Sequence, residues 1–370
     1  MLNKIVFLKF LYTKNVCKRF SLIPLYLNIL LTGLLFSCSP GRLDIDVSDI
    51  DVEIQIKRFE KDLFELNPDS VLARISFFEK KYGLFYELFN TRIINIGGVD
   101  HPSYGYNLKN FITDPDMRSV NEECINQYND LENLSDDLSQ AFKHYRYYFP
   151  EKPVPEIITF ISGFNYSIIT ADSILGIGLD MYLGQGYKFY SMLQLPKYKT
   201  QNMNKEKIVT DCMRGWAMSE FEEGDPLSAG VQSPPSWQTE QKDLLSQMIY
   251  QGKILYFVDA MLPLVVDSLK IGYTSQQIKW CGNNESNIWT FFIDKKLLYS
   301  TDHTENIKYI GEGPFTQSFP DGSPARIGQW MGWQIIRAYM ENNPDVSLKE
   351  LMYNYNAQKI LTKSKYKPPR

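Results

Sequence analysis

The chain has 370 residues, of which 44% are hydrophobic and 14% aromatic. This composition supplies a substantial core and excludes a wholly disordered protein. With 39 basic and 43 acidic residues, the chain lacks the excess positive charge of an electrostatic nucleic-acid binder, so no nucleic-acid partner is expected.

Residues 1–37 have the features of a secretory signal peptide. They carry five basic residues and no acidic one, and the apolar run FSLIPLYLNILLTGLLF occupies residues 20–36. Pro24, Asn28 and Thr32 interrupt this run, whereas a membrane-spanning helix needs about 20 apolar residues. Leu35-Phe36-Ser37-Cys38 resembles a bacterial lipobox, in which the cysteine is lipidated and becomes the first mature residue. The alternative is an ordinary signal peptide cut beside a cysteine.

Lipidation at Cys38 would tether the mature chain to a membrane, since two or three acyl chains give stable anchoring. We expect a signal peptide at residues 1–37, a lipidated N-terminus and tether at 38–49, and a single α+β domain at 50–370. Removing residues 1–37 leaves 34 basic against 43 acidic residues. Of the cysteines, Cys124, Cys212 and Cys281 remain beside Cys38. Three buried free thiols are favoured over one disulfide with one thiol left over.

The first predicted element follows the tether. Ile50, Val52, Ile54 and Ile56 alternate with polar residues, which predicts a half-buried strand. The acidic residues between them indicate a solvated strand face rather than a calcium loop, because no glycine-bearing ligand loop accompanies them.

Further elements follow from caps, prolines and periodicity. Asn67 and Asp114, each before a proline, are predicted helix N-caps, and apolar residues at three- and four-residue steps predict a helix over residues 131–149. PEIITFISGFN and DSILGIGLDMYLG are predicted strands. Further helices are predicted over 204–221, 240–261, 275–298 and 324–341, with capping boxes at Thr274/Gln277 and Ser347/Glu350 and with loops over 223–237 and 299–323. The pattern indicates an α+β fold, mainly helical with a small mixed sheet.

The chain offers few residues for catalysis or metal binding. Its three histidines, His101, His144 and His303, do not form an HExxH motif, and no metal site or cofactor is expected. His144 lies near a helix C-terminus, where a partly charged imidazole would complement the helix dipole. No GxSxG elbow and no phosphate-binding loop is present. Asp172 and Asp180 are a weak candidate for paired carboxylates.

The segment SPARIGQWMGWQIIRAYM, residues 323–340, carries the other candidate site. Ser323 and Pro324 predict a helix start, and Gly328 and Gly332 would let a neighbouring backbone approach closely. The segment is either a tightly packed core helix or a partner-docking surface. A docking surface would expose part of its tryptophans and arginines, which dominate interface hot spots: Arg326, Trp330, Trp333 and Arg337.

Six stretches together resemble the gliding-motility lipoprotein family GldB. They are IKRFEKDLFEL, AFKHYRYYFP, ADSILGIGLDMYLG, LLSQMIYQGKILYF, IGYTSQQIKWCGNNESNIWTFFIDKKLLYSTD and SPARIGQWMGWQIIRAYM. The resemblance implies an outer-membrane lipoprotein that is needed for gliding where gliding occurs, with no established enzymatic activity.

A more distant likeness concerns predicted zinc peptidases of zincin type, which carry HExxH on a helix corresponding to IVTDCMRGWAM. The matching positions here are Asp211, Cys212 and Gly215, so the likeness implies a degenerate zincin whose metal site is lost. Asp211 and Arg214 are expected to form a helical ion pair instead.

The resemblance and the residues together favour a non-catalytic outer-membrane lipoprotein that acts through contacts with envelope motility or secretion proteins. The expected location is lipid-anchored and facing the periplasm. The alternative is an envelope hydrolase, either a peptidase or a cell-wall glycan enzyme, that uses carboxylates not recognised in the sequence.

Overall fold

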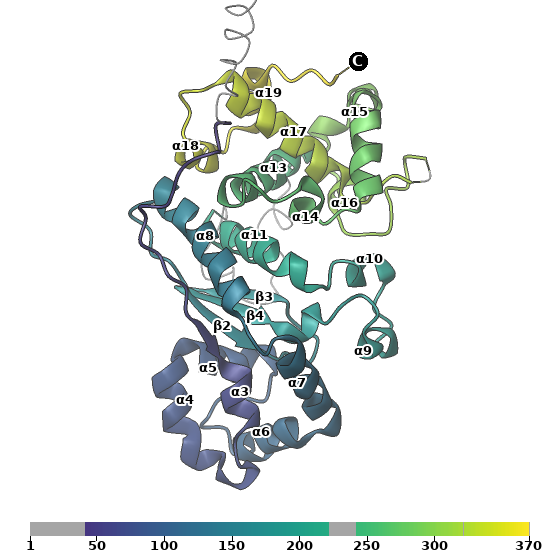
Figure 1. The fold of residues 1–370 in the computed structure, drawn as a ribbon. Coiled ribbons are helices and arrows are strands. Elements are labelled where there is room, and N and C mark those ends of the chain that lie inside the picture. The colour runs from purple at the N-terminus through teal and green to yellow at the C-terminus, as the bar shows by residue number, and fades with distance from the viewer. Residues whose placement is uncertain (1–40, 222–241, 321, 370) are drawn as a thin grey trace, which may run out of the picture. The chain divides into compact units, whose positions relative to one another are not determined.

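The structure, a computed structural model, describes residues 41–221, 242–320 and 322–369. The chain divides into two units, residues 1–45 and residues 46–370. The helices and strands of the described residues all fall in the second unit, where many helices surround one small sheet (Figure 1). The predicted α+β class, mainly helical with a small mixed sheet, is confirmed.

The sheet has four strands among the described residues, in the order β1-β2-β4-β3. β2 runs parallel to both β1 and β4, and the edge strand β3 is antiparallel to β4. The strands are β1 (Ile56–Arg58), β2 (Glu156–Phe160), β3 (Ile168–Ala171) and β4 (Ile174–Gly178). β2 and β4 confirm the two predicted strands. β3 was not predicted; it pairs with β4 and is joined to it by a two-residue turn, in which Asp172 has a φ of 46°.

The predicted strand over residues 50–56 is wrong for most of its length, because only residues 56–58 pair with a neighbouring strand. The alternation of burial is nevertheless present, with Ile54 buried and Glu53 and Gln55 exposed. The partner of this segment is the helix α8 (Glu132–Tyr148). The amide of Ile54 donates to Ser139 Oγ at 2.9 Å, and the Ser135 hydroxyl donates to the carbonyl of Ile54. A helix therefore covers the apolar side, and burial at every second residue arises without a strand ladder.

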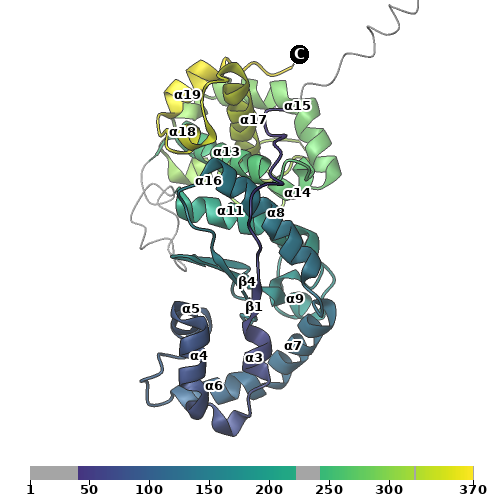
Figure 2. The ribbon, with the colours of Figure 1, turned by 60° about the vertical axis from the view of Figure 1, so that its left-hand side comes forward.

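The helices before β2, other than α8, cover one face of the sheet (Figure 2). The Phe59 ring meets the rings of Phe85 and Phe89 at centroid distances of 5.1 and 4.6 Å, and Phe85 reaches Phe160 of β2 at 5.6 Å. The helices are α3 (Phe59–Phe64), α4 (Ile75–Tyr82), α5 (Leu84–Leu88), α6 (Tyr104–Thr113) and α7 (Pro115–Gln127), with short turns at Pro68–Ser70, Leu72–Arg74 and Phe89–Ile93. Asn67 and Asp114 act as the predicted caps.

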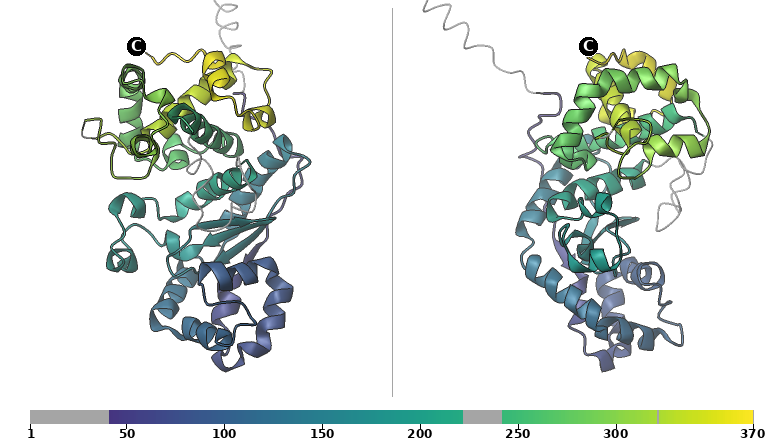
Figure 3. Two further views of the ribbon diagram at one scale, coloured as in Figure 1. Left: turned by 180° about the vertical axis from the view of Figure 1, so that it is seen from behind. Right: turned by 90° about the vertical axis from the view of Figure 1, so that its right-hand side faces the viewer.

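The other face of the sheet carries α8 and α11 (Ile208–Glu220), and α13 (Leu244–Met261) and α17 (Ile327–Asn342) pack beyond them (Figure 3). The backbones of α13 and α17 touch at two glycines. A Cβ added at Gly252 would lie 2.8 Å from the amide nitrogen of Trp333, and one added at Gly332 would lie 2.5 Å from the carbonyl carbon of Met248. The predicted close approach of a neighbouring backbone at Gly332 is confirmed.

The remaining helices close the C-terminal half. They are α9 (Lys188–Met192), α10 (Lys197–Thr200), α14 (Asp267–Ile271), α15 (Ser275–Asp294), α16 (His303–Ile310), α18 (Leu348–Met352) and α19 (Ala357–Ser364), with short 3-10 turns at Leu179–Tyr182, Lys205–Lys207 and Leu297–Tyr299. Both predicted capping boxes are present, at the starts of α15 and α18.

Several boundaries differ from the prediction: the helices predicted over 204–221, 240–261 and 275–298 are the shorter helices α11, α13 and α15. Two further differences have a visible cause. The stretch 299–323 contains α16, because the Asp302 carboxylate accepts hydrogen bonds from the amides of Thr304 and Glu305 and starts a helix there. α17 begins at Ile327 rather than at Ser323, whose hydroxyl instead donates to the carbonyl of Thr316. The predicted loop over 223–237 lies outside the described residues.

Candidate functional site

Helix α11 carries the positions that the zincin likeness singles out. It lies against the edge strand β3 and β4 on one side and against α13 on the other. A Cβ at Gly215 would lie 2.8 Å from Ile168 of β3, so the absence of a side chain there lets the helix approach the sheet closely. Cys212 is fully buried on the same helix, and Asp211 remains partly exposed.

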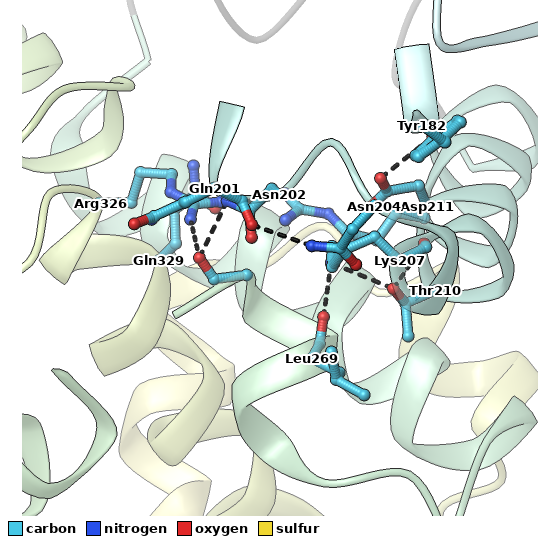
Figure 4. A network of polar contacts seen from close by, with 12 residues as sticks. Tyr182, Gln201, Asn202, Asn204, Lys207, Thr210, Asp211, Leu269, Arg326 and Gln329 are labelled. Carbon is cyan, nitrogen blue, oxygen red and sulfur yellow. Dashed lines mark hydrogen bonds and ion pairs between the residues drawn. The ribbon is translucent and has the colours of Figure 1, made fainter. Parts of the chain in front are cut away.

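Asp211 is held by two neighbours (Figure 4). Its carboxylate lies 3.1 Å from the Lys207 ammonium, one turn earlier, and accepts a hydrogen bond of 3.1 Å from the Tyr182 hydroxyl. Lys207 is buried and also donates to the Thr210 hydroxyl and to the carbonyl of Leu269. Burial lowers the pKa of Lys207, and Asp211 opposes that shift. The Asp211 carboxylate therefore neutralises a buried ammonium.

The expected ion pair between Asp211 and Arg214 is wrong, because Asp211 pairs with Lys207. Arg214 donates instead to the Gln329 side chain of α17 at 3.3 Å. Lys207 lies four residues before Asp211 and Arg214 three residues after it, so both spacings allow a helical ion pair. The hydrogen bond from Lys207 to the Leu269 carbonyl helps to hold the ammonium beside Asp211.

The three positions thus hold an ion-paired carboxylate, a buried thiol and a glycine. Burial raises the pKa of Cys212 well above its usual value, so the thiol stays protonated at neutral pH. Cys124, Cys212 and Cys281 are all free and buried, which confirms the prediction of three thiols. Among residues 41–221, 242–320 and 322–369, no three His, Cys, Asp or Glu side chains gather closely enough to hold a metal ion.

None of the three histidines lies on α11. His144 is buried in α8, and burial lowers its pKa, so the neutral imidazole is favoured. The expectation of a partly charged imidazole at that helix end is wrong. His101 and His303 are exposed, in a turn and in the first turn of α16 respectively.

Asp180 is a buried carboxylate whose role the sequence analysis missed. It accepts hydrogen bonds from the backbone amides of Ser162 and Phe164 at 3.1 and 2.6 Å and from the Ser162 hydroxyl at 3.1 Å. Burial raises its pKa to about 6. Asp172 lies beyond the opposite end of β4, so the two carboxylates do not form a pair. Through these hydrogen bonds, Asp180 holds the segment between β2 and β3 in place. No spacing of residues in the sequence predicts this role.

The residues proposed for docking on α17 are mostly buried. Trp333 is 0% exposed, Trp330 5% and Arg326 6%, whereas the docking alternative needs part of these side chains to be exposed. Trp333 Nε1 donates to Asp259 of α13 at 2.8 Å, and the Arg337 guanidinium stacks 3.8 Å above its ring. These contacts favour the alternative of a tightly packed core helix.

Arg337 closes a partly buried ionic cluster, which we call the Asp259 cluster: Asp259, Asp267, Lys270, Trp333 and Arg337. Arg337 makes four hydrogen bonds of 2.7–3.0 Å to the two carboxylates, and Lys270 lies 2.9 Å from Asp259. The two carboxylates keep the pKa of Arg337 above its usual value although burial opposes this. The cluster ties α13, α14 and α17 together.

A known protein family matches nearly the whole described chain. Residues 41–368 match the family described as "Gliding motility protein GldB". The chain belongs to the GldB family. Searches among curated proteins and among solved structures gave no match.

The GldB family is a family of gliding-motility lipoproteins. Membership of this family fits a membrane-anchored protein of the cell envelope. Over the described part of the chain, no helix combines the length and apolar character needed to cross a bilayer. Cys38 itself lies outside the described residues. The zincin likeness is shown by none of the comparisons and stays a prediction.

Proposed function

We propose that this GldB-family protein is a non-catalytic lipoprotein of the gliding-motility and cell-envelope machinery that acts through contacts with other envelope proteins. Its anchor is a lipid on Cys38 in the outer membrane, and the domain faces the periplasm. The family match carries the proposal, because it spans residues 41–368 and so covers nearly all of the chain after Cys38.

The surroundings of Asp211 support a role without catalysis. A carboxylate that serves as a metal ligand or general base must be free to meet its metal or proton. Asp211 instead faces the buried Lys207 ammonium and the Tyr182 hydroxyl, and position 215 offers no side chain. No observation on the described residues favours the envelope-hydrolase alternative.

The charge of the mature chain supports protein partners over nucleic acid. After residues 1–37 are removed, 34 basic residues face 43 acidic ones. The expected partners are envelope motility or secretion proteins. Crosslinking in the native envelope, followed by co-purification, would identify them.

To test the proposal, a gliding host in which the gene is deleted is complemented with three versions of the gene: wild type, Cys38→Ala and Asp211→Asn. Cys38→Ala should lose palmitate labelling and accumulate the unprocessed precursor. Asp211→Asn should reduce gliding only as far as it reduces the amount of folded protein, because its expected defect is the unpaired Lys207.

Protein level by immunoblot and purified-protein melting temperature serve as controls for both variants. Unchanged labelling of Cys38→Ala would contradict lipid anchoring. Lost gliding in Asp211→Asn, at wild-type protein level and melting temperature, would contradict a non-catalytic role.

A further inference from the structure

A small polar pocket lies where α10, the junction of α14 and α15, and the loop before α17 meet. Its volume is about 160 Å³, and its wall includes the side chains of Lys197, Gln201, Tyr273, Glu312 and Arg326. We call it the Arg326 pocket. It lies beside a polar network that leads from the Gln201 carbonyl through Asn204 to Lys207 and Asp211 (Figure 4).

Arg326 occupies an unusual position in this pocket. It is the residue before the first turn of α17, its φ is 58°, and its side chain is only 8% exposed. A left-handed backbone is uncommon for a residue other than glycine, asparagine or aspartate and costs free energy that glycine avoids. Such strain at a buried charged residue suggests a function for that side chain. The conformation brings the guanidinium to the pocket wall, 5.4 Å from the Tyr273 ring.

The guanidinium of Arg326 is poorly supplied with acceptors. Arginine presents five N–H donors in a planar fork. Within the described residues, Arg326 has one hydrogen bond of 3.3 Å to the carbonyl of Gly272 and one ion pair of 3.5 Å to Glu312. Arg337, on the same helix, makes four hydrogen bonds of 2.7–3.0 Å to two carboxylates although it is more exposed. The comparison shows that Arg326 has unused donors.

Positive charge exceeds negative charge around the pocket. Arg214 lies nearby with the Gln329 side chain as its acceptor at 3.3 Å, and burial together with Arg326 lowers the pKa of Arg214. Lys197 adds a third cation at the wall. The carboxylates that interact with these arginines are Asp211, which already pairs with Lys207, and Glu312. The pocket therefore suits an anion.

Glu312 indicates which anion fits. Its side chain is 57% exposed, yet its carboxylate reaches the buried Arg326 from the loop before α17. At 3.5 Å this pair is longer than an optimal charge-assisted hydrogen bond, and the exposed partner gains little from it. A carboxylate can thus approach Arg326 from the solvent side, and a better-placed one would replace Glu312.

We propose that the Arg326 pocket binds a carboxylate group, with Glu312 as the internal carboxylate that the ligand displaces. The carboxylate belongs either to an acidic side chain of a protein partner or to a small free acid. Two oxygens of one carboxylate match the guanidinium fork. The site does not depend on lipidation at Cys38, so its failure and the failure of the proposed anchoring are separate results.

The test is calorimetric titration of the full chain, purified in detergent, with two probes. One probe is glutarate, and the other is the tripeptide Ala-Glu-Ala with acetylated and amidated ends. At least one should bind the wild type. Arg326→Gly should weaken that binding about tenfold or more, because a charge-assisted hydrogen bond is lost. Glu312→Gln should strengthen it several-fold, because the competing carboxylate is gone.

Arg326→Gly is chosen because glycine adopts a φ of 58° freely, so the start of α17 should be kept. Circular dichroism melting checks the fold, and Arg92→Gln, at an exposed arginine, controls for the change in net charge. Binding of the peptide alone assigns the carboxylate to a protein partner, and binding of glutarate assigns it to a free acid. Binding of neither probe, equal binding of Ala-Gln-Ala, or unchanged binding in a folded Arg326→Gly would overturn the proposal.

Discussion

Replacing Gly332 by alanine should destabilise the protein, although alanine is the better helix former. A Cβ at this position would lie 2.5 Å from the carbonyl carbon of Met248 and 3.2 Å from its Cα, and both atoms belong to the backbone of α13. No rotamer change can relieve a contact with backbone. The carbonyl oxygen of Met248 would lie closer still, so restoring ordinary separations of ~3.5 Å requires the two helices to move apart by roughly 1 Å or more.

The magnitude follows from two opposing terms. A gap of ~1 Å forfeits up to about half of the dispersion energy at each contact it opens, and overpacking a core typically costs about 1–3 kcal/mol or more. The gain in helix propensity returns roughly 1 kcal/mol. Because α13 and α17 are buried along most of their length, we place the net loss at about 2 kcal/mol or more. Because the entropy of unfolding grows with chain length, each kcal/mol shifts the melting temperature of a chain of this size by roughly 1.5 °C, so the melting temperature should fall by about 3 °C or more.

Gly282→Ala is the matched control. Gly282 lies in the middle of the long helix α15, and a Cβ there would meet no atom within 4 Å. The same substitution should therefore stabilise the protein by about 0.5–1 kcal/mol. Thermal unfolding of both variants, followed by circular dichroism, gives the comparison. If Gly332→Ala melts at or above the wild-type temperature, the close backbone contact between α13 and α17 is not what the structure shows.

Two further predictions concern buried charges. Burial, and after it Lys242, lowers the pKa of Lys253 from 10.5 to about 7, so above pH 7 the unfolded chain binds more protons than the folded one. The Lys253 contribution to the free energy of unfolding should then rise with pH by at most ~1.4 kcal/mol per pH unit. Urea unfolding at pH 7.0, 7.75 and 8.5 measures this slope, and Lys253→Met should remove it. Equal slopes in the wild type and the variant would refute the assignment. Arg337→Glu should destabilise the protein by on the order of 3–5 kcal/mol, because it places a third carboxylate beside Asp259 and Asp267, and a wild-type melting temperature would contradict the structural role of the cluster.

Local signals in the sequence predicted the longer helices and several caps. Asp114 before a proline and the pair Thr274/Gln277 satisfy backbone donors within three residues, so nothing distant decides them. The glycines of α17 predicted a close backbone approach, because a helix carries two such costly residues only where something is gained.

Errors arose where a distant partner decided the structure. Ile54 has the burial pattern of a strand because Ser135 and Ser139 of α8 take its backbone hydrogen bonds, and the sequence shows the pattern without its partner. Asp180 became a structural carboxylate through amides on the segment that follows β2. In both cases the decisive atoms belong to elements whose packing no local spacing reveals.

The arginines of α17 show why candidate docking residues could not be separated from structural ones. Arg326 and Arg337 both looked like interface anchors, and both are partly or wholly buried. What distinguishes them is the supply of acceptors: Asp259 and Asp267 come to Arg337 from α13 and α14, whereas Arg326 meets one carbonyl and one exposed glutamate. The filled donors of Arg337 stabilise the fold, whereas the spare donors of Arg326 are available to the carboxylate that we propose as its ligand. That difference lies in how three helices and a loop come together, so only the folded chain assigns one arginine to the core and the other to a pocket.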